Sequence, residues 1–179
     1  IDATTFYKDI RDLLGVEFIS TYNDAEYAHL TNVDFGNVVG ITLAMDFIDM
    51  GPLTISLDYT WEEAVGNSSD PRETATRAEA GEDPRPRLMP FNWDQRHTLN
   101  STITVSKPSY SFSGVVRVVS GQPYTPVLEA GYGFGLEANS GRKPAGILID
   151  LRGEVPVRAT GTPVSVFCRV FNLLDSEFF

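Results

Sequence analysis

The chain has 179 residues, of which 42% are hydrophobic and 21% charged, a formal net charge of −10 at pH 7 and a sequence pI near 4.6. This length permits one domain with a sizeable core, and the acidic balance excludes a nucleic-acid partner, because phosphate binding relies on an excess of Lys and Arg. The single cysteine, Cys168, excludes an internal disulfide and a tetrahedral thiolate metal site.

Seven segments alternate between apolar and polar residues with the period of a β-strand, and none keeps a helical period. In chain order they cover residues 1–8, 39–47, 53–61, 98–106, 112–119, 147–158 and 164–171. The pattern therefore predicts an all-β, antiparallel protein.

Each of these segments has one apolar and one polar face. We predict that one face carries Ile41, Leu43, Leu57, Ile103, Val116, Ile149 and Val166. The opposite face carries charged residues in mid-strand, namely Asp58, Arg117, Arg152 and Arg169. Charges at such positions would line the water-filled interior of a barrel or the exposed surface of a soluble sandwich.

The connections between the segments differ in length at the two ends of the sheet. Gly, Pro and Asp predict tight turns at residues 49–52, 107–110 and 159–162. The other connections are long and cover residues 9–35, 66–92 and 121–145. Short turns at one end and long loops at the other are typical of outer-membrane β-barrels. Aromatic residues near both ends agree with two interfacial girdles, with Tyr59 and Trp61 near the loops and Phe47 and Phe112 near the turns.

A series of short sequences resembles the TonB-dependent receptors of Gram-negative outer membranes. In order along the chain they are FYKDIRDLLG, TNVDFGNVVGITLAMD, LDYTWEEAVGNSSDP, WDQRHTLN, SGQPYTP, NSGRKP followed by IDLRGE, and VFCRVFNLLDSEFF. The last contains FNLLD, which resembles the motif that closes the penultimate barrel strand. Within WDQRH we expect a loop to re-enter the membrane, with Trp93 at the interface.

The resemblance implies a transmembrane barrel of about 22 strands, plugged by an N-terminal domain and importing a scarce ligand with energy from TonB. Residues 1–179 are then expected to be the C-terminal portion, about seven to eight strands, with the plug domain, TonB box and remaining strands outside this chain. The expected partners are outer-membrane lipid, those missing parts, TonB and a small-molecule ligand such as a siderophore, vitamin, oligosaccharide or peptide. We predict no cofactor, and the sequence does not assign ligand-binding residues.

Two other functional classes remain open. One is a structural or adhesive surface β-protein whose long loops bind partners, and the other is a soluble secreted β-sandwich that binds a ligand. An enzyme is not expected: Asp94, His97 and a nearby Ser could form a hydrolase triad, but no nucleophile-elbow motif accompanies them. His29 and His97 lack partners at metal-ligand spacing, so no metal site is predicted.

Four further features are expected to have no special role. We interpret the glycine-rich residues 131–141 and the charge-rich residues 77–87 as solvated loops. The two glycosylation sequons, at Asn67 and Asn100, are interpreted as chance matches.

Overall fold

A computed structural model describes residues 1–20, 26–67, 88–126, 138–159 and 162–177. Every regular element in these ranges is a β-strand, which confirms the all-β prediction. The strands are β1 (Asp2–Ser20), β2 (Glu26–Met50), β3 (Leu53–Gly66), β4 (Met89–Pro90), β5 (His97–Lys107), β6 (Tyr110–Val119), β7 (Pro123–Tyr124), β8 (Gly141–Arg142), β9 (Gly146–Ala159) and β10 (Thr162–Val170). None of the described residues belongs to a helix that is long and apolar enough to cross a membrane.

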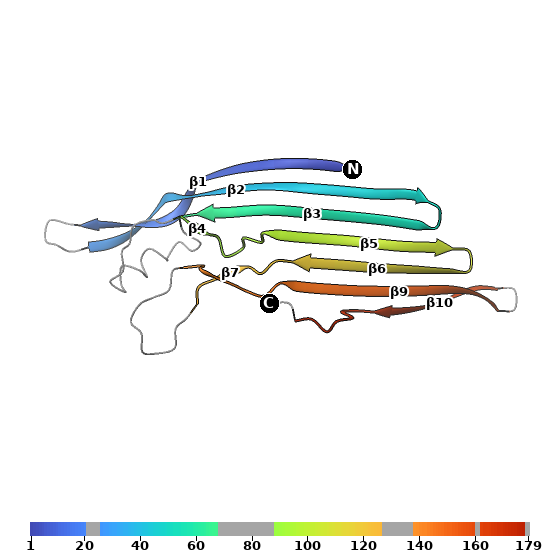
Figure 1. The fold of residues 1–179 in the computed structure, drawn as a ribbon. Helices are drawn as coiled ribbons and strands as arrows, with labels where there is room; N and C mark the ends of the chain where they lie inside the picture. The colour runs from blue at the N-terminus through green and yellow to red at the C-terminus, as the bar shows by residue number, and fades with distance from the viewer. Residues whose placement is uncertain (21–25, 68–87, 127–137, 160–161, 178–179) are drawn as a thin grey trace.

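The main sheet follows the order of the chain. Its strands run β1-β2-β3-β5-β6-β9-β10, each antiparallel to the next, and β4 pairs with the end of β3 (Figure 1). A separate two-stranded sheet consists of β7 and β8. The order places β1 and β10 at opposite edges, so the sheet is open within the described residues.

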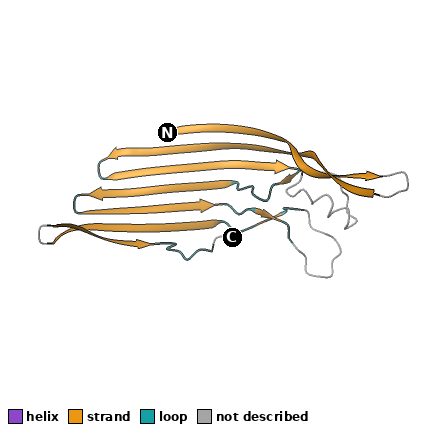
Figure 2. Ribbon diagram, turned by 180° about the vertical axis from the view of Figure 1, so that it is seen from behind, coloured by secondary structure: helices purple, strands orange, loops and turns teal. Residues whose placement is uncertain are grey.

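The two ends of the sheet are connected differently, as predicted. Two tight turns, between β2 and β3 and between β5 and β6, lie at the same end as the facing ends of β9 and β10, where Ala159 pairs with Thr162. Gly51 in the first turn has a φ of +67°, which glycine adopts without steric cost. The facing ends of β3 and β5, and those of β6 and β9, lie at the opposite end, which we call the loop end (Figure 2).

The predicted long connection over residues 9–35 is wrong, because β1 and β2 continue through most of it as one paired ladder. Ser20 pairs with Glu26, and only residues 21–25 between them lie outside the described residues. The register shifts twice between Ile10 and Leu14, and Asp12 has a φ of +59°. This bulge breaks the two-residue alternation on which the prediction depended.

The predicted faces are confirmed by the register, because directly paired residues lie on the same face. One row joins Leu57, Ser101, Val116 and Ile149 across β3, β5, β6 and β9. All seven residues predicted for the apolar face share it, and we call it the apolar face. The opposite, polar face has Asp58, Asn100 and Arg117 in one row across three strands.

Arg152 and Arg169 are paired neighbours on that polar face. Each guanidinium lies over an aromatic ring, with Arg152 5.2 Å from the Phe167 centroid and Arg169 5.3 Å from that of Phe171. The two aromatic residues that interrupt the polar pattern near the C-terminus thus serve as stacking surfaces for cations.

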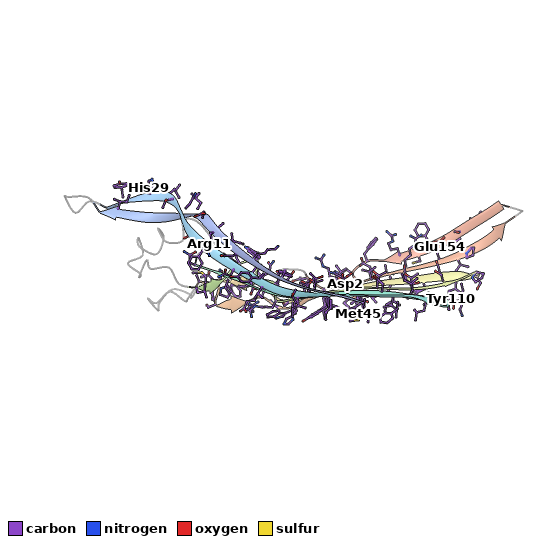
Figure 3. The ribbon with its side chains drawn as sticks, turned by 90° about the horizontal axis from the view of Figure 1, so that it is seen from above. Asp2, Arg11, His29, Met45, Tyr110 and Glu154 are labelled. Carbon is purple, nitrogen blue, oxygen red and sulfur yellow. The ribbon has the colours of Figure 1, made fainter. Side chains whose placement is uncertain are left out.

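Figure 3 shows that the sheet is strongly twisted. The end of the β1–β2 hairpin with His29 and the β9–β10 end with Glu154 curve toward the same side. Asp2 and Met45 mark opposite faces, because Asp2 pairs with Ala44, the neighbour of Met45. Twist is the normal consequence of strand geometry in a sheet of this kind.

Candidate functional site

Residues 88–97 fold back over the loop end of β2 and β3. The ring of Phe91 lies on two paired glycines, Gly36 of β2 and Gly66 of β3, and a Cβ at either position would overlap the ring. Phe91 packs with Val38 and Ala64 in a small buried cluster. Its outer side stacks on Trp93, with ring centroids 5.1 Å apart. Because the paired glycines have no side chains, the Phe91 ring packs directly on the sheet and holds this connection against it.

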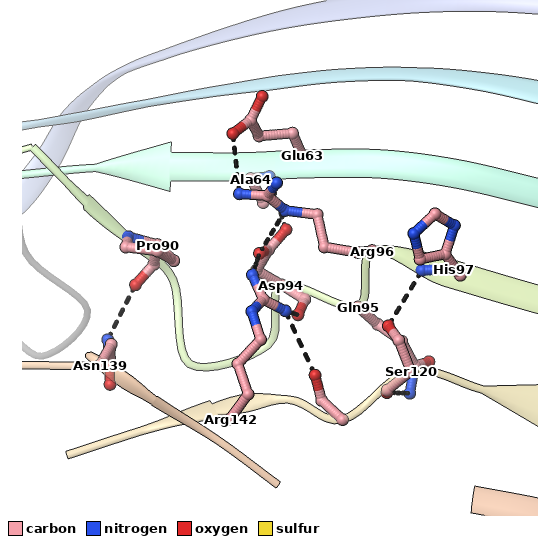
Figure 4. A network of polar contacts seen from close by, with 11 residues as sticks. Glu63, Ala64, Pro90, Asp94, Gln95, Arg96, His97, Ser120, Asn139 and Arg142 are labelled. Carbon is pink, nitrogen blue, oxygen red and sulfur yellow. Dashed lines mark hydrogen bonds and ion pairs between the residues drawn. The ribbon is translucent and has the colours of Figure 1, made fainter. Parts of the chain in front are cut away.

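Asp94 follows Phe91 in the same connection and lies at the centre of a polar network (Figure 4). Its side chain is fully buried. Oδ1 accepts a hydrogen bond from the backbone N–H of Ala64 at 2.9 Å. Oδ2 accepts hydrogen bonds from Arg96 Nε at 2.9 Å and from Arg142 at 2.6 Å. A buried carboxylate with three charge-assisted or backbone donors is fully satisfied.

The network joins three segments that are far apart in the sequence. Arg96 also donates to Glu63 of β3 at 2.7 Å, and Arg142 of β8 also donates to the carbonyl oxygen of Gly121 at 3.2 Å. The formal charges of Asp94, Glu63, Arg96 and Arg142 sum to zero. A neutral network of this kind joins β3, the connection that follows β4, and β8. We call these four residues the rim network.

Glu62 lies next to the rim network and has a raised pKa. Burial is the main cause, and the nearby charge of Asp94 adds to it, while Lys8 acts in the opposite direction. A raised pKa means that the folded state binds the Glu62 proton more tightly than the unfolded state does. The contribution of this residue to stability is therefore present at low pH and lost as the pH rises through its raised pKa.

Glu62→Gln is expected to stabilise the protein slightly at pH 7, because the amide needs no proton to be neutral. For the same reason, the free energy of unfolding is expected to fall less in this variant as the pH rises above the ordinary glutamate pKa. Glu63→Gln is the matched neighbour and is expected to destabilise the protein, because it removes one of the two charge partners of Arg96. Urea titrations between pH 4 and 8 measure both effects. If Glu62→Gln lowers stability at pH 7, our assignment of Glu62 is wrong.

The hypothetical hydrolase triad is not assembled. Asp94 is bonded within the rim network, whereas the ring of His97 bonds through Nδ1 to the hydroxyl of Tyr59 at 2.8 Å. Ser120 Oγ accepts a hydrogen bond from the backbone N–H of His97 and does not contact its ring. Within the described ranges, no three His, Cys, Asp or Glu residues form a group that could hold a metal ion.

The structure describes two of the loop residues discussed from the sequence, Trp93 and Asn67. Trp93 is 45% exposed, which fits an interfacial position but does not test one. Asn67 is buried, donates to Asp34 at 2.9 Å and accepts from the backbone N–H of Phe35. Its side-chain amide is therefore engaged in the fold. Residues 77–87 and most of the glycine-rich 131–141 lie outside the described residues.

The FNLLD motif forms a closed turn after β10. Asn172 has a φ of +48°, its Oδ1 accepts from the backbone N–H of Ser176, and its backbone N–H donates to Asp150. Asparagine tolerates this left-handed backbone and bonds to nearby backbone groups, which explains its place in the motif.

Sequence reasoning missed the rim network because its members are far apart along the chain. A signal existed in residues 94–96, where an acid and an arginine adjoin the aromatic residues Phe91 and Trp93, but nothing local predicts the approach of Arg142. No known protein-family model, curated protein or solved structure matches this chain.

Proposed function

We propose that this chain forms part of the wall of a β-barrel in the outer membrane of a Gram-negative bacterium. The barrel belongs to a TonB-dependent receptor that imports a scarce small-molecule ligand. Lipid contacts the apolar face, the polar face lines the interior, and the loop end faces the cell exterior.

The observation that carries the proposal is the exposed area of the apolar face. Large hydrophobic residues on this face are each 40% exposed or more, namely Ile41, Phe47, Ile103, Phe112, Ile147, Val155, Val157, Val164, Val166 and Val170. A soluble protein rarely leaves so many apolar side chains together on one exposed face. Hydrocarbon is the solvent in which such a face is stable.

Strand length supports the same proposal. A tilted strand crosses the hydrocarbon in about 9–11 residues. β5 has 11 residues, β6 has 10 and β10 has 9. Each is therefore long enough for one crossing, whereas β1 and β2 extend well beyond the others at the loop end.

The two edges of the sheet require partners in this setting. β1 and β10 each present an outer row of backbone groups that is unpaired within the described part of the chain. An unpaired backbone group in hydrocarbon costs several kcal/mol, so we propose that further strands of the same barrel close the wall. About eight strands already fill a barrel with side chains, which favours a larger one for import.

A β-sandwich would need a second layer over the apolar face. In the ranges that the structure covers, the only other sheet is β7–β8, with two residues in each strand. This cannot cover a face that extends over seven strands. The receptor assignment itself comes from the sequence resemblance, and the rim network supports it by joining described segments at the loop end of the sheet.

Whole-cell labelling tests the proposal and its orientation. In a Cys168→Ser background, Ser140→Cys at the loop end is expected to react with a membrane-impermeant maleimide on intact cells. Ser109→Cys, in the turn between β5 and β6, is expected to react only after the outer membrane is permeabilised. Both serines are exposed, so accessibility to the reagent within the fold is matched. The reverse pattern, or labelling of neither site after permeabilisation, would contradict the proposal.

A further inference from the structure

A second site lies on β1 and β2 and is separate from the rim network. It is a hollow of about 440 Å³, within the range of about 300–1,000 Å³ typical of small-molecule sites. Its lining includes Tyr7 and Phe35 as aromatic residues, and Asp9, Arg11, Asn32 and Asn37 as polar ones. We call it the bulge pocket, because the irregular residues Ile10 to Leu14 form part of it.

The bulge pocket begins where the apolar face ends. Ile41 pairs with Trp61 across β2 and β3, and the next pair on the same face is Val39 with Glu63. Tyr7 pairs with Val39, so it lies just beyond the level of Trp61 on the loop side. Asp9 and Asn37 form the following pair. The chain therefore changes from apolar to polar at this point while keeping an exposed aromatic ring.

The side chains of the pocket are held in position by one another. The hydroxyl of Tyr7 donates to Asn37 Oδ1 at 3.1 Å, which fixes the ring while leaving it 67% exposed. Arg11 donates through two nitrogens to Asp9 Oδ2, at 2.9 and 2.8 Å. Phe35 adds a second ring that is 42% exposed. Two exposed rings, one of them hydrogen-bonded through its hydroxyl, thus lie beside several planar polar groups.

The backbone at this position is also unusual. Asp12 lines the pocket with a φ of +59° inside the bulge, in a conformation that side-chain-bearing residues rarely adopt. The buried Asp34, which also lines the pocket, accepts a hydrogen bond from Asn67 and lies so close to Gly15 that a Cβ there would contact the carboxylate at 2.6 Å. Bulges of this kind redirect side chains and occur frequently beside binding sites.

We propose that the bulge pocket binds a carbohydrate. The C–H groups on one side of a sugar ring carry partial positive charge and pack against the negative face of an aromatic ring. Sugar hydroxyls both donate and accept, and they match carboxylate, amide and guanidinium groups that lie in fixed planes. Tyr7 and Phe35 supply the surfaces, while Asp9, Arg11 and Asn37 supply the hydrogen bonds.

Charge decides which kind of sugar fits. The lining contains three carboxylates, Asp9, Asp12 and Asp34, against one guanidinium, Arg11. Phosphate, sulfate and uronate groups would be repelled by this excess of negative charge. The pocket therefore takes a neutral or amino-bearing sugar.

Binding to a glycan microarray of neutral, amino-bearing and uronate-containing oligosaccharides tests the inference. The whole protein that carries this chain is used in detergent. We expect signals from neutral or amino-bearing sugars and none from polyuronates. The strongest oligosaccharide is then titrated by calorimetry, where Tyr7→Ala and Phe35→Ala are each expected to weaken binding about tenfold. Tyr7→Phe keeps the ring and is expected to retain affinity within about threefold.

Tyr110→Ala is the matched control. Tyr110 is an exposed tyrosine on the same face but at the turn end of β6, so its loss is expected to leave binding unchanged. An equal loss in Tyr110→Ala, or tight binding of polyuronates, would overturn the inference. Failure of every neutral and amino-bearing sugar, both free and in vesicles, would also overturn it.

Two sources of the sugar are distinguished by a second arm of the experiment. Phosphatidylcholine vesicles with and without a digalactosyl lipid report binding to a lipid headgroup. Dependence on Tyr7 in this arm alone assigns the pocket to a membrane glycolipid, and dependence in the microarray arm assigns it to a free oligosaccharide. The microarray arm does not require insertion into a membrane, so its outcome is independent of the function proposed above.

Discussion

Asp94→Ala is expected to lower the free energy of unfolding by about 2–3 kcal/mol, because it leaves the backbone N–H of Ala64 and two partly exposed guanidinium groups without their shared, fully buried acceptor. The side chain of Asp94 is fully buried and takes hydrogen bonds from Arg96, Arg142 and the backbone of Ala64. Its loss also removes the ion pair that links Arg142 to the connection following β4 and leaves the longer hydrogen bond, at 3.5 Å, from Arg142 to the carbonyl oxygen of residue 94. The two segments are therefore expected to be held together more weakly.

Asp58→Ala is the control for that substitution. Asp58 is an exposed carboxylate in the middle of β3, and its removal is expected to change stability by less than about 0.5 kcal/mol. Urea titration of the whole protein, followed by heat-modifiable gel mobility, measures both variants. Equal stability of the two variants would show that the rim network does not hold the loop end together.

Ile103→Arg is expected to cost about 2–4 kcal/mol, because in the proposed barrel it places a charge in the hydrocarbon near the middle of β5. Ile103 lies on the apolar face between Ile55 of β3 and Gly114 of β6, and 40% of its surface is exposed. The cost arises from the surrounding solvent, since no protein side chain has to be displaced from a packed core.

Thr102→Arg is the neighbouring control on the polar face, where Thr102 lies between Ser56 and Val115. A guanidinium there stays in contact with water, so the expected cost is well below that of Ile103→Arg. Both variants are compared by urea-dependent folding into lipid vesicles. Equal costs at the two positions would contradict the proposed membrane-facing side.

The strand pattern and the two faces could be predicted because they depend on local information. A two-residue alternation specifies which side chains share a face, and tight turns carry their own Gly, Pro and Asp signals. This was sufficient for residues such as Leu57 and Val116, which lie in one row across three strands. Closure into a barrel is a non-local property, so it remains a prediction.

Two parts of the structure could not be predicted in the same way. The bulge near Asp12 shifts the register, so apolar and polar residues no longer alternate and the strand signal is lost. The rim network depends on Arg142 reaching Asp94 from a different connection, at a separation of 48 residues. No period or local motif encodes such a contact.

Collision accessibility of spin labels along β5 tests most directly whether the apolar face contacts lipid. Single cysteines at positions 98 to 106, in a Cys168→Ser background, are labelled with a nitroxide in lipid bilayers. Oxygen, which concentrates in hydrocarbon, is expected to relax labels at 99, 101, 103 and 105. A water-soluble nickel chelate is expected to relax those at 98, 100, 102, 104 and 106. Nickel accessibility at the odd positions, or the absence of a two-residue period, would contradict the proposed membrane wall.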